Sequence, residues 1–484
     1  MEAELGGLEP ALVWERFAEL TRIPRPSKQE EAARAHVLAW AAARDLGTRV
    51  DAEGNVVVRV PASPSRGEAP IVVLQAHLDM VCERDAESPF DPREGRINVV
   101  VDGDWVVAEG TTLGADNGIG VAGAMAVADD PAVEHGPLEL LFTVSEEQGL
   151  DGVKALDPTL VSGRVLVNLD GTSDGSLTVG CAGSAHTYVR LQLATEPIRD
   201  GAAALEVVLS GARGGHSGED IASGPANAIK ALGRVLSRGF EAAPFGLAHL
   251  SGGVSRNAIP REARARLVVE QRREEAFRSA AHDELAALRD QYSANEPGLA
   301  LSIASTEVAT TTSTAATQRM LDLIRAIPTG VIAMSPEVAG RLETSTCLTV
   351  ATTEDGTLTL GSMTRSSSAA AVDNVVSTIE SLARSAGAEI EVKRSYPPWQ
   401  PSLDSRLLDT ARKTYRRLFS IEPALTVVHG GLECAVIGEK LPGIEMISVG
   451  PEIVGLHAPG ERLSISSTQR FYRLLGALLD DLSR

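Results

Sequence analysis

Short apolar runs alternate with helical patterns over the first part of this chain. Residues 71–74, Ile-Val-Val-Leu, are β-rich and follow Pro70, which is typical of a buried parallel strand. Strands that alternate with helices indicate a layered α/β fold. The pattern predicts strands at 55–60, 71–76, 104–108, 138–144 and 164–169, and helices at 9–20, 29–45 and 118–129.

The pattern changes near residue 186 and predicts a second unit of the α+β type. Segment 306–316 is rich in Thr, Ala and Ser and is predicted to be a loop. A strand at 388–393 then begins a C-terminal α/β stretch. The other predicted strands are 187–193, 204–210, 263–269, 298–304, 424–428 and 443–449, and the helices are 225–238, 272–291, 316–326, 403–418 and 465–482.

The length and composition indicate a globular protein with more than one domain. A chain of 484 residues is too long for one typical hydrophobic core. Hydrophobic residues make up 43% and the mean hydropathy is +0.01, which is ordinary for a folded protein. The net charge of −20 argues against nucleic acid as a partner, because phosphate would be repelled.

Targeting and redox signals point to the cytoplasm. No apolar run approaches the ~20 residues of a membrane span, so no membrane partner is expected. The acidic start, residues 1–4, is followed by no apolar core and is not a secretory signal. The four cysteines lie far apart with no Cys-x-x-Cys pair, which is typical of a reduced cytosolic protein. Any metal must therefore be held by His and carboxylate side chains.

His77 and Asp79 follow the predicted strand at 71–76. Residues i and i+2 of an extended backbone point the same way, so both side chains share one face. The carboxyl end of a strand is where open α/β sheets place ligand sites. A His beside a carboxylate suits a metal ligand held in one tautomer. The alternative is a buried His whose hydrogen bonds are satisfied within the core.

Two further acidic segments are candidates for the same site. Asp116 lies in Gly-Ala-Asp-Asn-Gly at 114–118, where the alternative is a turn capped by Asp. Glu146 and Glu147 follow the apolar run at 138–144 after a single serine, and adjacent buried carboxylates are costly without a cation. One could bind a metal while the other faces a water as general base. The alternative is two solvated surface glutamates.

Asp170 and His457 complete the set of candidate ligands. Asp170 ends the apolar run at 165–169, with Asp174 as a nearby competitor, and a turn-forming Asp is the alternative. His457 lies in a Gly/Pro-rich loop, and His429 is its rival. Two His and three carboxylates suit two cations that share one carboxylate. Nitrogen and oxygen ligands without thiolate favour zinc, with manganese or cobalt as substitutes. The set is His77, Asp116, Glu147, Asp170 and His457.

The order of these motifs resembles the di-zinc metallopeptidases that include carboxypeptidase G2-like and aminoacylase-like enzymes. Most of all it resembles the bacterial aminoacylhistidine (Xaa-His) dipeptidases, or peptidase D group, over nearly the whole chain. The matching segments include Gly-Cys-Ala-Gly at 180–183, Gly-Gly-His-Ser-Gly at 214–218, Arg-Asn-Ala-Ile-Pro at 256–260, Tyr-Pro-Pro-Trp at 396–399 and Gly-Leu-Glu-Cys at 431–434.

The resemblance implies a role for each candidate. One metal would be held by His77 and Asp170 and the other by Glu147 and His457. Asp116 would bridge them, and its peptide bond to Asn117 would be cis. The remaining catalytic roles implied are orientation of His77 by Asp79 and general-base catalysis by Glu146.

The resemblance also implies a domain arrangement and substrate contacts. A catalytic domain with a mixed sheet flanked by helices, residues 1–185 and 386–484, would be interrupted by a smaller α+β lid at 186–385. The lid would form a homodimer. His216 and Asn257 of the lid would reach the substrate, and Arg365 would bind the terminal carboxylate of a dipeptide.

The expected activity is hydrolysis of dipeptides, of the Xaa-His (carnosine-like) type, by a water activated by two metals. An N-acyl amino acid deacylase or a tripeptidase of the same architecture is an alternative that shares every metal ligand. A non-catalytic metal-binding scaffold protein would be expected to lack Glu146 or a ligand, and none is missing. Arg25 stands where the resemblance leads us to expect His. Because this departure falls on no metal ligand, we expect it to bear on substrate range rather than on the chemistry.

Overall fold

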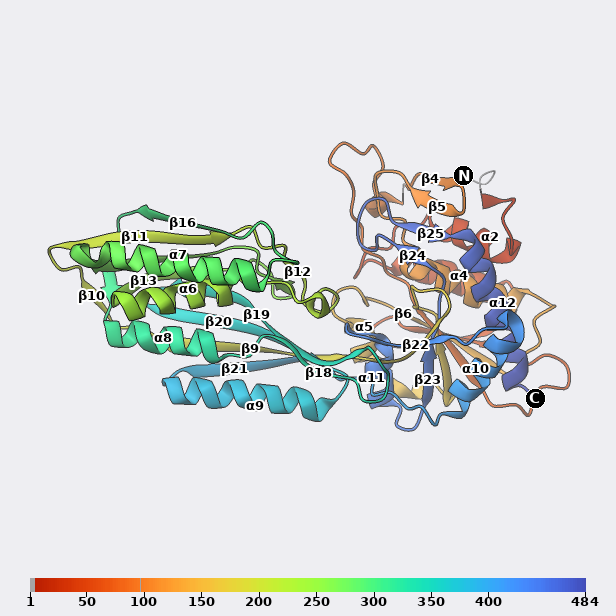
Figure 1. Ribbon diagram of the computed structural model, residues 1–484. Helices are drawn as coiled ribbons and strands as arrows, with labels where there is room; N and C mark the ends of the chain where they lie inside the picture. The colour runs from red at the N-terminus through yellow and green to blue at the C-terminus, as the bar shows by residue number, and fades with distance from the viewer. Residues whose placement is uncertain (1–4, 96) are drawn as a thin grey trace. The chain divides into compact units, whose positions relative to one another are not determined.

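The computed structural model describes residues 5–95 and 97–484 of the chain. These residues divide into two compact units, each with its own large sheet (Figure 1). Unit 1 contains the described residues up to Cys181 together with 399–428 and 432–484, and unit 2 contains 182–398 and 429–431. Unit 2 thus interrupts unit 1 in the sequence.

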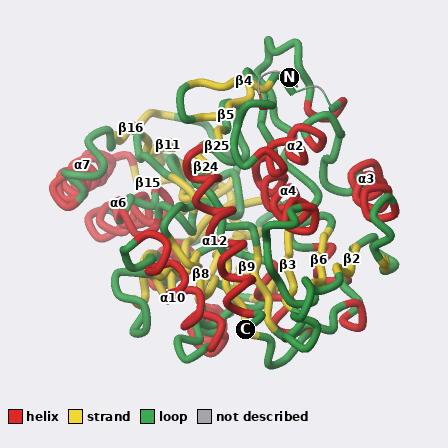
Figure 2. Tube along the Cα trace, turned by 90° about the vertical axis from the view of Figure 1, so that its right-hand side faces the viewer, coloured by secondary structure: helices red, strands yellow, loops and turns green. Residues whose placement is uncertain are grey.

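Unit 1 is built on a mixed sheet of eight strands among the residues described. Its central strand β3 lies parallel to β6 on one side and to β7 on the other, and is buried throughout. Figure 2 shows β2, β6 and β3 side by side. In spatial order the strands are β1 (Gly47–Val50), β2 (Val56–Val60), β6 (Leu138–Thr143), β3 (Val72–His77), β7 (Val165–Asn168), β23 (Glu445–Ser448), β8 (Ser176–Cys181) and β22 (Ala424–Val428).

Helix α4 packs closely on the sheet of unit 1 because it is made of small residues. It contacts both β3 and α2. A Cβ atom on its Gly120 would lie 2.6 Å from the carbonyl oxygen of Leu169, so only glycine allows this approach. The helices of unit 1 are α2 (Ala11–Leu20), α3 (Glu31–Ala42), α4 (Ala115–Asp129), α5 (Asp151–Ala155), α10 (Arg406–Phe419), α11 (Glu433–Lys440) and α12 (Ile465–Leu482), and a small sheet joins β4 (Val99–Asp102), β5 (Trp105–Ala108), β25 (Arg462–Ser464) and β24 (Ile453–Val454).

Unit 2, all of whose residues are described, is built on a sheet in which every pair of neighbours is antiparallel. The spatial order is β16 (Ala300–Ser305), β11 (Ala202–Ser210), β15 (Ala263–Glu270), β13 (Phe245–Gly252), β19 (Leu342–Glu354), β20 (Thr357–Ser366), β9 (Gly183–Gln192) and β21 (Glu389–Tyr396), with β18 (Gly330–Met334) also paired to β19. Two short ribbons join β10 (Thr195–Pro197) to β17 (Thr310–Thr312) and β12 (Gly215–His216) to β14 (Ala258–Ile259).

Aromatic edge-to-face contacts bind the helices of unit 2 to its sheet. Phe245 of β13 lies 5.5 Å from Phe277 and 5.3 Å from Phe240, measured between ring centroids. Phe245 and Phe277 are buried in one continuous apolar core. The helices are α6 (Ala228–Ala242), α7 (Glu274–Gln291), α8 (Thr314–Ala326) and α9 (Ala369–Ala386).

Two sequence-based expectations differ from the structure. The strand at 388–393 was expected to resume the catalytic domain at 386, but β21 pairs with β9 inside the sheet of unit 2. Unit 1 therefore resumes at Trp399. The predicted loop at 306–316 contains β17, which pairs with β10, and the start of α8. No helix in the described ranges has the length and apolarity needed to cross a membrane.

Candidate active site

Three parallel strands of unit 1 deliver polar side chains to one edge of the sheet. The register pairs His77, the last residue of β3, with Thr143, the last residue of β6. Gln75 of β3 pairs with Asn168, the last residue of β7. Because carboxyl ends of parallel strands meet at one edge, His77 and the residues that follow β6 and β7 converge there. The residues that follow are Glu146, Glu147 and Asp170.

Asp116 enters this edge from the first turn of α4. Gly114 before it has φ +69°, a left-handed conformation that glycine adopts without strain. The Oδ1 atom of Asp116 lies 3.0 Å from Nε2 of His77, which confirms that the two residues are neighbours. The peptide bond between Asp116 and Asn117 is cis, as the resemblance implied.

His457 comes from a loop near the C-terminus and reaches the same carboxylate. Its Nε2 atom lies 3.3 Å from Oδ2 of Asp116 and 3.1 Å from Oε2 of Glu147. The two oxygens of Asp116 therefore face two different imidazoles. On the other side of the site, Nε2 of His77 lies 3.4 Å from Oδ1 of Asp170.

These contacts define two groups of three side chains that share Asp116. In the part of the chain that the structure describes, His77, Asp116 and Asp170 form one group, and Asp116, Glu147 and His457 form the other. Within each group one ligand atom per residue lies within 4.8 Å of the others. His77, Glu146 and Glu147 make a third, overlapping group, so geometry alone also permits Glu146 as a ligand.

The side chains present fit divalent metal ions. Four carboxylates and two imidazoles meet in a largely buried place, and carboxylates gathered there without cations would repel one another. The Oε1 atom of Glu147 is buried and has no hydrogen-bond partner among the described residues. Imidazole nitrogen and carboxylate oxygen without thiolate are ligands that zinc accepts, and manganese and cobalt are alternatives.

The pKa values of the carboxylates reflect their crowding. Burial, reinforced by the charge of Asp116, raises the pKa of Asp170 to about 8. Burial also raises the pKa of Glu146 well above its usual value, and the charges of Asp170 and Glu147 act in the same direction. The raised pKa values reflect crowding of negative charge, which a bound cation would relieve.

The two imidazoles have raised pKa values for a related reason. Hydrogen bonds to Asp116 and Glu147 raise the pKa of His457 to about 11. Burial opposes protonation of His77, but the charge of Asp170 and the hydrogen bond to Asp116 outweigh it and raise its pKa well above 6.5. A proton and a metal ion compete for the same ring nitrogen. The raised pKa values therefore indicate that the surroundings of both rings favour a bound cation.

Asp79 links two parts of the site. Its Oδ1 atom lies 3.3 Å from Nδ1 of His77, the ring nitrogen that faces away from Asp116. Its carboxylate also accepts hydrogen bonds from the backbone N–H groups of Glu146 (3.0 Å) and Glu147 (3.1 Å) and from the hydroxyl of Ser27 (2.7 Å). Sequence reasoning gave the contact with His77 and missed the other three.

A buried polar chain below the site was also missed. Asn168 donates to Gln75 (2.6 Å), and Gln75 donates to Glu433 (2.5 Å). The same Glu433 oxygen accepts from the hydroxyl of Thr143 (2.7 Å). Burial raises the pKa of Glu433 to about 7. The motif at 431–434 marked this segment, but nothing in the sequence tied Glu433 to strand ends far away along the chain.

The proposed substrate-binding residues lie in unit 2. Arg365 is buried, its Nη1 atom donates to the Tyr396 hydroxyl at 3.2 Å, and its Nη2 atom lies 3.5 Å from Nε2 of His216. Among the described residues no carboxylate forms an ion pair with Arg365, and its Nε atom has no hydrogen-bond partner. Asn257 is exposed, and its side-chain oxygen accepts from Ser255 at 2.6 Å.

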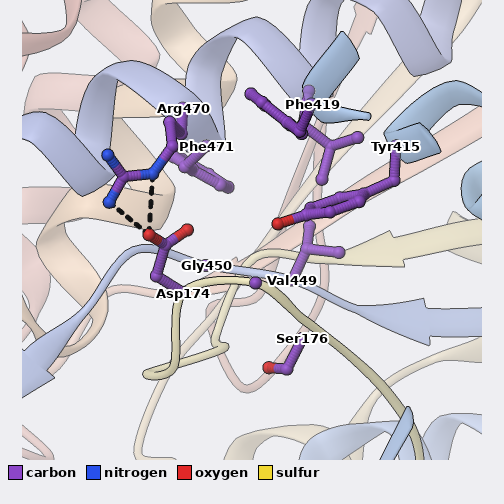
Figure 3. Close-up of a pocket in the computed structure, with 10 residues that line it drawn as sticks. Asp174, Ser176, Tyr415, Phe419, Val449, Gly450, Arg470 and Phe471 are labelled. Carbon is purple, nitrogen blue, oxygen red and sulfur yellow. Dashed lines mark hydrogen bonds and ion pairs between the residues drawn. The ribbon is translucent and has the colours of Figure 1, made fainter. Parts of the chain in front are cut away.

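The two competing candidates, His429 and Asp174, lie outside the ligand groups. The Nε2 atom of His429 lies 2.7 Å from the hydroxyl of Ser345 within unit 2. Asp174 pairs with Arg470 at one side of a small pocket, with Tyr415 opposite (Figure 3). The pocket volume of ≈ 10 Å³ has room for about one water molecule. Asp170, rather than Asp174, lies beside His77.

A family model and a curated relative match nearly the whole chain. The model described as peptidase family M20/M25/M40 matches residues 73–481. The cytosol non-specific dipeptidase of Escherichia coli (strain K12) is 37% identical over 483 residues, which are 99% of this chain and 99% of the relative.

Solved structures show the same fold. The crystal structure of aminoacylhistidine dipeptidase from Vibrio alginolyticus matches with a TM-score of 0.91 and 35% identity, covering 99% of this chain and 98% of that one. The aminopeptidase PepT from Bacillus cereus ATCC 10987 matches with a TM-score of 0.57 and 15% identity, covering 99% and 100%, and shares the fold alone. The mixed α/β fold predicted from the sequence is confirmed.

Two neighbouring aspartates offer a matched test of the ligand groups. We expect Asp170→Asn to weaken metal binding by more than the ~10–100-fold typical of lost supporting residues, because it removes a candidate ligand oxygen. Asp174→Asn should bind metal as the unaltered protein does. It should lose at most about 1 kcal/mol of stability, because its ion pair with Arg470 is partly exposed. Metal titration and thermal denaturation of both variants check this, and equal metal binding would contradict the assignment.

Proposed function

The chain belongs to peptidase family M20/M25/M40, and from this membership we propose that it is a metal-dependent dipeptidase. The observation that carries the proposal is the pair of three-residue groups that share Asp116 at the carboxyl edge of the unit 1 sheet. Sites of two metals that share a carboxylate are a recurrent device for hydrolysing amide bonds.

Each residue of the site then has a defined task. His77 and Asp170 would hold one ion, Glu147 and His457 the other, and Asp116 both. The ions, when bound, supply Lewis-acid polarisation of the scissile carbonyl and lower the pKa of the attacking water. Asp79 holds Nδ1 of His77, so that Nε2 stays directed at the ligand site.

Glu146 is the proposed general base. Its backbone N–H is held by Asp79, which fixes the turn, while its side chain belongs to none of the groups that contain Asp116. Burial raises the pKa of its carboxyl group, which makes it a stronger base than an exposed glutamate. It would accept a proton from the attacking water and deliver that proton to the leaving amine.

The proposed substrates are free dipeptides, with Xaa-His among them. One relative is named a non-specific dipeptidase and a solved relative an aminoacylhistidine dipeptidase, so we place His within a wider range of C-terminal residues. Arg365 supports this choice, because a buried guanidinium without a carboxylate partner among the described residues can bind a free carboxylate by two hydrogen bonds. His216 and Asn257 are proposed to contact the same substrate.

Two other functions remain as alternatives. A deacylase of N-acyl amino acids or a tripeptidase would use the same metal ligands and differ in the substrate pocket. A non-catalytic metal-binding scaffold would have no need of Glu146, which is present and placed beside the ligand groups. We therefore favour catalysis, and substrate tests distinguish the hydrolases.

We further propose zinc as the native metal, a cytosolic location and a homodimer formed through unit 2. The location is supported by the name of the Escherichia coli relative and by four cysteines that are all unpaired. The dimer is supported by β18, on which Val331, Ile332 and Met334 are exposed apolar side chains. Metal analysis and sedimentation of the purified protein test the metal and the dimer.

The direct test of the proposed function combines metal removal with a substrate panel. We expect a chelator to abolish hydrolysis of Xaa-His and Xaa-Leu dipeptides, and zinc, manganese or cobalt to restore it, because the bound ions would polarise the carbonyl and activate the water. Tripeptides and N-acetyl amino acids should be poor substrates. Release of amino acids measured by chromatography decides the outcome, and faster cleavage of N-acetyl amino acids would favour the deacylase.

Glu146→Gln should lose most activity while binding metal normally. The amide keeps the shape of the side chain but cannot accept a proton, and loss of a general base typically costs ~10²–10⁴-fold in turnover. Turnover together with metal content measures this, and the exposed Glu87→Gln serves as a control. A variant that instead loses one ion would make Glu146 a ligand, as the third group permits.

Arg365→Ala should impair hydrolysis of free dipeptides far more than that of their C-terminal amides. The amides lack the carboxylate that Arg365 is proposed to bind, and contacts remote from the scissile bond position it for reaction. The ratio of kcat/KM for acid and amide, measured in both proteins, is the readout. An equal loss on both substrates would assign Arg365 a structural role.

A further inference from the structure

Arg25 makes hydrogen bonds to both backbone turns that meet at His77 and Asp116. It lies in the segment between α2 and α3 and is 1% exposed. Its Nη1 atom donates to the carbonyl oxygens of Leu78 (3.0 Å) and Asp79 (2.9 Å). Its Nη2 atom donates to the carbonyl oxygen of Gly114 (2.5 Å). One guanidinium thus joins the turn after β3 to the turn that begins α4.

This arginine differs from an ordinary buried ion pair. Within the residues described, no carboxylate lies at ion-pair distance from Arg25, and its Nε atom has no partner. Burying a cation among carbonyl groups is costly in free energy. Two glycines nevertheless leave room for the guanidinium. A Cβ atom on Gly114 or on Gly118 would lie only 2.6 Å from its Nη2 atom.

Glu461 holds the same turn from its N–H side. It is 2% exposed and follows the loop that carries His457. Its Oε2 atom accepts from the N–H groups of Leu113 (2.8 Å) and Gly114 (2.9 Å). Its Oε1 atom accepts from those of Ala115 (2.9 Å) and Asp116 (3.3 Å). Four consecutive N–H groups therefore converge on one carboxylate.

The two contacts tie Asp116 to the two histidines by separate routes. Arg25 binds the carbonyl oxygen of Gly114, in the turn that carries Asp116, and thereby connects this turn to the one that follows His77. Glu461 connects the N–H side to the loop of His457, which a further bond from the Gly460 N–H to the carbonyl of Thr111 holds in place (3.2 Å). The side-chain oxygens of Asp116 take part in neither contact and face the imidazoles.

We propose that Arg25 and Glu461 form a clamp that fixes Asp116 midway between His77 and His457, and that both are positioning residues for the second metal ion. This inference rests on the proposed function, since it requires that Asp116 serve two ions. With one ion bound, a loosened Asp116 can shift toward it. When two ions are bound, the Asp116 carboxylate cannot shift toward either one. A looser clamp therefore lowers the affinity for the second ion most.

The test measures metal binding rather than activity. Metal-free Arg25→Lys and Glu461→Gln are titrated with zinc and with manganese, and the two dissociation constants are compared with those of the unaltered protein. We expect the second constant to rise about 10–100-fold in both variants, the range typical of residues that support ligands, and the first to change less. The cobalt absorption spectrum of the doubly loaded protein should shift as well.

Arg44→Lys is the matched control. Arg44 also lies in unit 1, bonds to Asp129 and donates to the carbonyl oxygen of Trp40 at 3.1 Å. Its replacement removes a well-bonded guanidinium from the segment that follows α3, and it affects neither turn. We expect a loss of thermal stability with both metal constants unchanged.

Unchanged second-ion constants in Arg25→Lys and Glu461→Gln, at a stability loss like that of the control, would overturn the clamp. If a variant folds only with metal bound, release of ions from the loaded protein to a chelator replaces the titration, and an unaltered rate overturns the inference equally. Failure of the unaltered protein to bind two ions or to cleave dipeptides would instead contradict the proposed function. The two failures are therefore distinguishable.

Discussion

Repulsion between buried carboxylates is the constraint on which this site depends. Asp116, Glu146, Glu147 and Asp170 crowd around two imidazoles at one edge of a sheet, where burial makes like charges costly. The residues that surround the site share one feature, which is that they bind backbone atoms. Asp79 and Glu461 bind backbone N–H groups, and Arg25 binds backbone carbonyls. These contacts hold the main chain and leave most oxygens of the candidate ligands without such bonds.

The fold supplies the site in two different ways. Sheet register places His77 and Asp170 at the ends of parallel strands, and it brings the chain to the Glu146–Glu147 turn, which Asp79 then holds. Asp116 and His457 come from a glycine-flanked turn and a loop, which have no register to position them. Hydrogen bonds position these two segments in place of a sheet register. This explains why the buried carboxylate of Glu461 accepts four hydrogen bonds from the main chain.

Where local patterns are strong, the sequence predicted the strands of unit 1 and the gathering of candidate ligand side chains at their ends. Strands β3, β6 and β7 are largely apolar because most positions on both faces are buried, so the polar residues that follow them are easily recognised. The sequence did not predict β19 and β20, which are rich in Thr and Ser. It assigned β21 to the wrong unit, because the sheet to which β21 belongs depends on a partner strand distant in sequence. Arg25 was expected to bear on substrate range, yet it bonds to the backbone of the turns beside His77 and Asp116. Neither this contact nor that of Glu461 could be predicted, because hydrogen bonds to backbone atoms produce no recognisable residue pattern.

The interruption of unit 1 by unit 2 has a consequence for how the protein is made. Strand β23 lies between β7 and β8 in the finished sheet, although both of those strands are synthesised long before it. The gap between them cannot close until residues 445–448 have left the ribosome, and by then every strand of the antiparallel unit has been synthesised. His457 and Glu461 follow β23 in the sequence. The candidate metal site therefore gathers its residues only after every strand of unit 2 has been synthesised.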